Sequence, residues 1–215
     1  AGRETLRADY VLDWNIVASD VLQANTSSQN PGMASRTMAM VNIALHDALN
    51  SIAPQHRAMY QYAPPPAAGR PPEAAMAEAA YQVLAAIYPD QQSHLDAALD
   101  NSLSGIADGA AKNSGRIFGQ HVAATVLSQR ADDGFDHSVQ YMPTDAPGRW
   151  QPDPLNPGQE AWGPAWESLR PFGLASVSQV HVPAPPALDS PVYADALNEV
   201  KELGAIDSLT RTPEQ

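Results

Sequence analysis

Apolar residues recur along much of the chain at the three- and four-residue spacing of amphipathic helices. The clearest stripe consists of Val41, Leu45, Ala48 and Ile52, and Pro54 marks the end of that helix. The same pattern predicts helices over about residues 9–24, 33–52, 73–88, 91–103, 106–130 and 191–203. These periodicities predict an all-α helical bundle with almost no strand.

Two pairs of glycines follow the spacing at which small residues let helices approach closely. They are Gly105 with Gly109, and Gly115 with Gly119, at the start of the longest predicted helix. A glycine at every fourth position leaves room for the backbone of a neighbouring helix. The sequence therefore predicts close helix packing there.

The stretch 135–190 is different from the rest of the chain. It is rich in proline, which has no backbone N–H and interrupts helices, and it contains three of the four tryptophans. Disordered tails are poor in aromatic residues, so we predict an ordered arm that wraps the bundle and is held by its aromatic side chains. We expect a single helical domain, with a bundle over 1–134, the arm over 135–190 and a returning helix in 191–215.

Composition and charge narrow the range of partners. The chain of 215 residues has 24 acidic and 12 basic residues, giving a formal net charge of −12. Nucleic acids and anionic membranes require a Lys/Arg surface, so neither is expected as a partner. There is no cysteine, and no apolar run approaches the roughly 18 residues of a membrane span. The chain starts at Ala1 rather than Met, which leaves a secreted or periplasmic location open.

Histidine and aspartate next to each other provide the main candidate for chemistry. His46 and Asp47 are adjacent on the second predicted helix, and we interpret them as a buried, hydrogen-bonded structural pair. A metal site made from His46 and His56 is the less favoured alternative, because ten residues separate them. The acidic cluster Asp132, Asp133 and Asp136 lacks the glutamate that closes a calcium loop, so we expect it to be a solvated helix end.

Several stretches of the sequence resemble, in order, the N-terminal bundle of the vanadium-dependent haloperoxidases, which are grouped with the type 2 phosphatidic acid phosphatases. They are residues 38–52 (MAMVNIALHDALNSI), 81–84 (YQVL), 88–89 (YP), 130–134 (RADDG), 147–152 (PGRWQP), 170–172 (RPF), 183–190 (PAPPALDS), Tyr193 and 198–204 (NEVKELG). The resemblance implies a helical fold and a complete enzyme in which vanadate lets peroxide oxidise halide.

The anion-binding motifs that the resemblance implies are not found in this chain. The family supplies a lysine seven residues before an Arg-Pro, a Pro-Ser-Gly-His, and a later arginine followed by a histidine. Here Arg170 precedes a proline, but Gly163 stands seven residues before it, and Ser93 is followed directly by His94. We therefore expect no catalytic, vanadate-binding or metal-binding residue in this chain, with vanadate held elsewhere in the complete enzyme.

The last four residues, 212–215 (TPEQ), have the pattern of a helix start with a capping box. We accordingly expect the chain to be the N-terminal part of a larger enzyme. We also expect it to need its own C-terminal half, or a second copy, to cover the apolar stripes of the second and the long helices. Two alternatives remain open for the complete protein: an acid phosphatase of the same superfamily, and a non-catalytic scaffold or assembly module.

Overall fold

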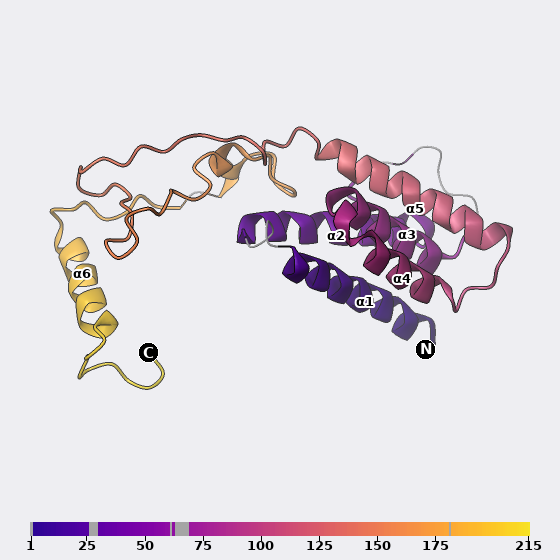
Figure 1. The fold of residues 1–215 in the computed structure, drawn as a ribbon, viewed down its shortest axis with the longest axis horizontal. Helices are drawn as coiled ribbons and strands as arrows, with labels where there is room; N and C mark the ends of the chain where they lie inside the picture. The colour runs from indigo at the N-terminus through magenta and orange to yellow at the C-terminus, as the bar shows by residue number, and fades with distance from the viewer. Residues whose placement is uncertain (1, 26–29, 61, 63–68, 181) are drawn as a thin grey trace. The chain divides into compact units, whose positions relative to one another are not determined.

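The computed structural model describes residues 2–25, 30–60, 62, 69–180 and 182–215, and within this part of the chain it has six α-helices and no strand (Figure 1). The helices are α1 (Gly2–Ala24), α2 (Pro31–Ile52), α3 (Pro72–Ile87), α4 (Gln92–Leu103), α5 (Ala110–Gln129) and α6 (Pro191–Gly204). The described residues also form short 3₁₀ helices, η2 (Pro89–Gln91), η3 (Trp166–Ser168) and η4 (Val177–Gln179). The predicted all-α class is confirmed.

The chain divides into two compact units, Ala1–Phe135 and Asp136–Gln215. The first contains α1 to α5, and the second contains η3, η4 and α6. Whether the predicted arm wraps the bundle stays a prediction, and residues 63–68 of the proline-rich connector lie outside the described residues.

Helix α3 lies at the centre of the first unit and packs against α1, α2, α4 and α5. Five of its seven alanines, at positions 74, 75, 77, 79 and 80, are fully buried, as are Met76, Val83 and Leu84. A helix covered on most of its surface needs apolar side chains on most of its faces, and small ones let its neighbours come close. The alanine-rich composition thus accounts for the central position of α3 as well as for its helicity.

The predicted close packing occurs between α3 and α5. A Cβ atom added at Gly119 would lie 2.5 Å from the carbonyl oxygen of Ala75 and 2.8 Å from the Cβ of Glu78. At Gly115 it would lie 3.0 Å from Ala74 Cβ. The second glycine pair is therefore confirmed as a contact surface. The first pair is not, because nothing lies within 4 Å of a Cβ built at Gly105 or at Gly109.

Helix α5 begins four residues later than the sequence pattern indicates. Gly109 has a φ of +141°, a backbone conformation that residues other than glycine rarely adopt. Ile106 belongs to a turn that follows α4, in which its N–H donates to the carbonyl of Leu103. The apolar residue at position 106 belongs to the loop, so its spacing relative to α5 is coincidental.

The apolar stripe of α2 is covered within the first unit. Val41, Leu45 and Ala48 are each at most 1% exposed, mainly through packing against α3 and α5. The expectation that this stripe requires a further partner was wrong. Phe118, Val122 and Val126 of α5 are likewise buried, although Ile117 is 65% exposed.

The second unit has short elements separated by irregular backbone. Tyr141 contacts Trp150 edge to face, with ring centroids 5.7 Å apart. Helix α6 begins at Ser190, whose side chain accepts a hydrogen bond from the backbone N–H of Tyr193, and Pro191 occupies its first turn. None of its residues is buried. At the predicted capping box, the Gln215 side chain accepts a hydrogen bond from the backbone N–H of Thr212.

Candidate functional site

The Asp47 carboxylate is the centre of the first polar cluster. It is fully buried on α2 and accepts hydrogen bonds from the backbone N–H groups of Met59 (2.7 Å) and Tyr60 (3.0 Å) and from the hydroxyl of Tyr62 (2.6 Å). Burial and the bond to Asp47 raise the pKa of Tyr62. The carboxylate therefore ties the segment that follows α2 back onto the helix.

His46 is bonded to Asp47 but is less buried than expected. Its Nδ1 lies 3.0 Å from Asp47 Oδ1, while 40% of its side chain is exposed. The His46 and His56 rings stack with centroids 6.5 Å apart. Asn50 holds His56 in place, since its side-chain oxygen accepts the backbone N–H groups of Gln55 and His56. The expectation of burial holds for Asp47 and not for His46, because the helix turns the two adjacent side chains in different directions.

A second cluster surrounds Glu78, which the sequence analysis did not single out. This glutamate is fully buried on α3, and its carboxylate accepts hydrogen bonds from Arg116 Nε (2.7 Å), Gln82 (2.9 Å) and Gln120 (2.9 Å). Arg116 and Gln120 lie one turn apart on α5, so the Glu78 carboxylate links α3 to α5 next to Gly119. A single glutamate among buried alanines was the signal in the sequence.

The third cluster contradicts the expectation of a solvated acidic loop. Asp133 is 2% exposed, and its Oδ2 accepts hydrogen bonds from Arg36 Nε (2.8 Å) and Arg130 Nε (2.8 Å). Arg130 Nη2 lies 2.7 Å from the same oxygen, within ion-pair distance. Arg36 also donates to the backbone carbonyl of Arg130, and its guanidinium lies 3.9 Å from the ring centroid of Phe135. Asp133 turns inward because Arg36 and Arg130 are buried beside it, whereas Asp132 is exposed.

The ionised form of Asp133 is favoured in the folded protein. Burial raises the pKa of this carboxyl, but the hydrogen bond and positive charge of Arg36, with smaller effects from Phe135 N–H and Arg130, outweigh it. The net pKa lies below its ordinary value. The cluster is therefore one carboxylate between two guanidinium groups.

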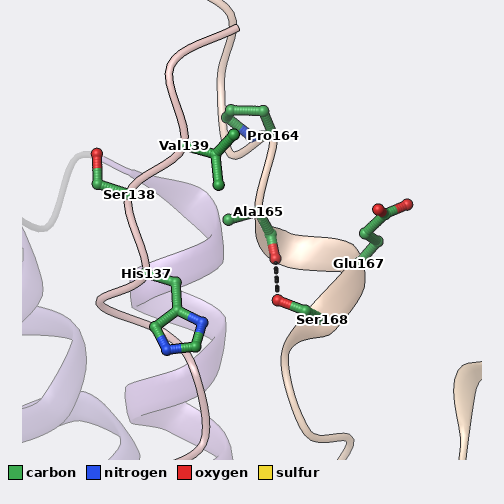
Figure 2. Close-up of a pocket in the computed structure, with 7 residues that line it drawn as sticks. All are labelled: His137, Ser138, Val139, Pro164, Ala165, Glu167 and Ser168. Atoms are coloured by element: carbon green, nitrogen blue, oxygen red, sulfur yellow. Dashed lines mark hydrogen bonds between the residues drawn. The ribbon is translucent and has the colours of Figure 1, made fainter.

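In the second unit, a pocket of about 400 Å³ brings a histidine near a serine (Figure 2). His137 lines it with residues of the segment 164–168. The Ser168 hydroxyl donates to the backbone carbonyl of Ala165 at 2.7 Å. Because this hydroxyl is directed at a carbonyl and not at the imidazole, the two side chains do not form the hydrogen-bonded pair that nucleophilic catalysis requires.

The fragments of anion-binding motifs belong to different units. Ser93 and His94 are both exposed on α4. Gly163, where the resemblance requires a lysine, has a φ of +62° in a turn in which Trp166 N–H donates to its carbonyl. That backbone conformation and the nearby Trp166 ring favour glycine, and with no side chain position 163 supplies no cation to Arg170.

Two features are absent from the part of the chain that the structure describes. No group of three or more histidine, aspartate or glutamate side chains could hold a metal ion. No helix is both long and apolar enough to cross a membrane.

Comparison with known proteins identifies one similarity. Residues 3–160 match the family model described as vanadium chloroperoxidase N-terminal domain, which spans the first unit and the beginning of the second. No curated protein and no solved structure matches the chain.

Proposed function

The chain belongs to the vanadium chloroperoxidase N-terminal domain family, and from this we propose that it is the helical N-terminal part of a vanadium-dependent haloperoxidase-like enzyme. In the complete enzyme, hydrogen peroxide would transfer an oxygen atom to halide with uptake of a proton, giving hypohalous acid and water. Bound vanadate would supply the activation of peroxide. The observation that carries the proposal is the family match over 3–160.

The residues described in this chain do not fit vanadate. This multiply charged oxyanion requires several cationic donors together with a histidine. Arg36 and Arg130 are bonded to Asp133, and Lys112 pairs with Asp108 at 2.9 Å. The two arginines line a pocket between α2, α3 and α5, and no histidine is among the described residues that line it. We propose that vanadate is held by residues outside this chain. In this proposal, residues 1–215 contribute neither a catalytic nor a cofactor-binding residue.

The role proposed for this chain is structural. His46 and Asp47 hold the end of α2 and the segment after it in one arrangement. The second unit exposes apolar side chains on α6, among them Val192, Leu197 and Val200. Such side chains along one helix favour docking onto another surface. We propose that this surface belongs to the protein's own C-terminal half, with a second copy of the chain as the alternative.

An activity comparison tests the proposal. The complete protein, produced with vanadate, should halogenate an organic acceptor when peroxide and chloride or bromide are present, and omission of vanadate should abolish this. Residues 1–215 alone should do neither that nor bind vanadate by ⁵¹V NMR. Stoichiometric vanadate binding to residues 1–215 that is lost in Arg170→Ala would overturn the assignment of the cofactor to other residues.

The same samples distinguish the alternatives. Hydrolysis of a phosphate monoester by the complete protein, with no halogenation, would favour the acid phosphatase. Absence of both activities in a folded complete protein would favour the scaffold module.

A further inference from the structure

The second unit contains a pocket that the proposed function does not use. It has a volume of about 420 Å³ and is lined by irregular backbone within residues 138–143, 150–152 and 157–161. Tyr141 and Trp150 give it aromatic walls, and Glu160 is the only acidic or basic side chain among the described residues that line it. Pockets of this size that combine apolar walls with a few polar groups are typical of small-molecule sites.

The two aromatic rings form a corner. The Tyr141 and Trp150 rings stand at 83° to each other, with centroids 5.7 Å apart. Because they are nearly perpendicular, a group placed between them can contact the faces of both rings. The face of an aromatic ring carries negative charge density and attracts a cation within about 6 Å of its centre. The corner therefore provides two walls of a cage for a cation.

The chain on either side of the corner is held in place. The Gln151 side chain donates a hydrogen bond to the backbone carbonyl of Thr144, which links the stretch after Trp150 to the stretch after Tyr141. Proline occupies positions 143 and 152 and fixes φ there. Walls that are ordered before a ligand arrives lower the entropic cost of binding it.

Glu160 gives the pocket a negative charge. It follows two successive turns, in which Asn156 N–H donates to the carbonyl of Asp153 at 2.8 Å and Gln159 N–H to that of Asn156 at 3.0 Å. The Glu160 side chain is exposed and makes no hydrogen bond or ion pair with another described residue. The second unit has eleven acidic and four basic residues, a formal net charge of −7. Such a charge attracts cations and repels anions.

We propose that this pocket binds a small alkylated ammonium ion, of the choline type, that has no anionic group of its own. The ammonium head lies in the corner between Tyr141 and Trp150, and Glu160 balances its charge. A metal ion is not favoured, because hard cations need several oxygen ligands and the pocket supplies one carboxylate. An alkylated ammonium head has no N–H group that requires an acceptor, so aromatic walls suit it. This inference is independent of halide oxidation.

Calorimetry on residues 1–215 with defined probes tests the proposal. Choline should bind at least about tenfold more tightly than its neutral analogue, in which a tert-butyl group replaces the trimethylammonium group. Phosphorylcholine adds an anionic phosphate to the same head and should bind more weakly than choline at low ionic strength. The proposal would be overturned if choline did not bind, or if either of the other probes bound as tightly as choline.

Matched tryptophan variants locate the ammonium head. Trp150→Leu keeps an apolar side chain but removes the aromatic face, so choline binding should weaken by at least about fivefold. Trp162 is 61% exposed and is not among the residues that line the pocket, so Trp162→Leu should leave choline binding unchanged. Equal affinities of the two variants for choline would overturn the assignment to this corner.

The charge is tested with a pair of glutamate variants. Glu160→Gln keeps the shape of the side chain, and it should weaken choline binding about threefold without affecting the neutral analogue. Glu167 is also exposed but lies outside this pocket, so Glu167→Gln should bind choline as the unmodified chain does.

The glutamate pair decides the question even if Trp150→Leu disturbs the nearby turns. Because the Glu160 side chain is exposed, Glu160→Gln should fold like the unmodified chain. Circular dichroism checks this. A Glu160→Gln variant with undiminished affinity for choline would overturn the proposal.

Discussion

The two units of this chain differ in where their apolar side chains lie. All buried apolar side chains among the described residues except Ala165 belong to the first unit. Of the nineteen large apolar side chains that are exposed in the described part of the chain, fifteen belong to the second unit. The first unit therefore has its own hydrophobic core. The second unit has compact local turns and an amphipathic helix, α6, in which no residue is buried. The family resemblance by itself does not reveal this difference, since it covers both units.

The largest effect is expected from placing a charge in the core of the first unit. Leu45→Asp leaves a cavity and buries an unpaired carboxylate at a position that is 1% exposed. The free energy of unfolding should fall by about 4 kcal/mol or more. Denaturant unfolding followed by circular dichroism measures this loss.

The matched control is Leu197→Asp on α6, where the side chain is 53% exposed. This variant should change the free energy of unfolding by less than about 0.5 kcal/mol. Similar losses in the two variants would show that the units do not differ in burial as described.

The next effect separates two adjacent aspartates. Asp133→Asn leaves the buried arginines without their carboxylate and should cost about 3–5 kcal/mol at neutral pH. Asp132→Asn, at an exposed position, should cost almost nothing. Unfolding experiments at pH 7 measure both, and equal losses would contradict the assigned role of Asp133.

The pH dependence of this pair has a definite sign. The folded-state pKa of Asp133 lies below its unfolded value of about 3.9, so its contribution is complete above that pH and is lost as the pH falls toward the folded pKa. As the pH falls below about 3.9, the free energy of unfolding should decrease less steeply with pH in Asp133→Asn than in Asp132→Asn.

These aspartates also show what the sequence determines. Periodicity identifies α2 and its buried stripe because repeating apolar positions reflect the geometry of a helix. Which of two neighbouring aspartates turns inward depends on Arg36, 97 residues earlier, and on the packing of α5 against α2. The local sequence pattern contains no information about a contact between residues so far apart in the chain. The buried cluster was therefore missed, although its acidic residues were noticed.

The contact surface of Gly119 was predicted from spacing, and its consequence can be measured. Gly119→Ala places a methyl group 2.5 Å from a backbone oxygen and should cost about 1–3 kcal/mol because α3 and α5 must separate. Gly105→Ala, with open space around the added atom, should be neutral or slightly stabilising. A neutral Gly119→Ala in thermal unfolding would contradict the close packing of these helices.

The smallest expected effect concerns Tyr62. Tyr62→Phe removes the hydroxyl bond to Asp47 and should cost about 1 kcal/mol, whereas Tyr60→Phe, whose backbone N–H makes the bond to Asp47, should cost less. Because the folded-state pKa of Tyr62 is raised, its contribution is present below about pH 10 and is lost as the pH rises further. Denaturation between pH 9 and 11 should show a larger alkaline loss in the unmodified chain than in Tyr62→Phe, where the raised pKa values of Tyr10 and Tyr81 still contribute.

The bonds from Asp47 also determine how the segment after α2 exchanges its amide hydrogens with solvent. Met59 and Tyr60 lie outside any helix, yet their N–H groups are held by a carboxylate that is itself fully buried. Their amide hydrogens can exchange only when the hydrogen bonds to Asp47 break. Breaking them leaves the buried, charged carboxylate of Asp47 without these donors, which is costly. These irregular residues should therefore exchange as slowly as the helix interior, in the same cooperative opening as α2.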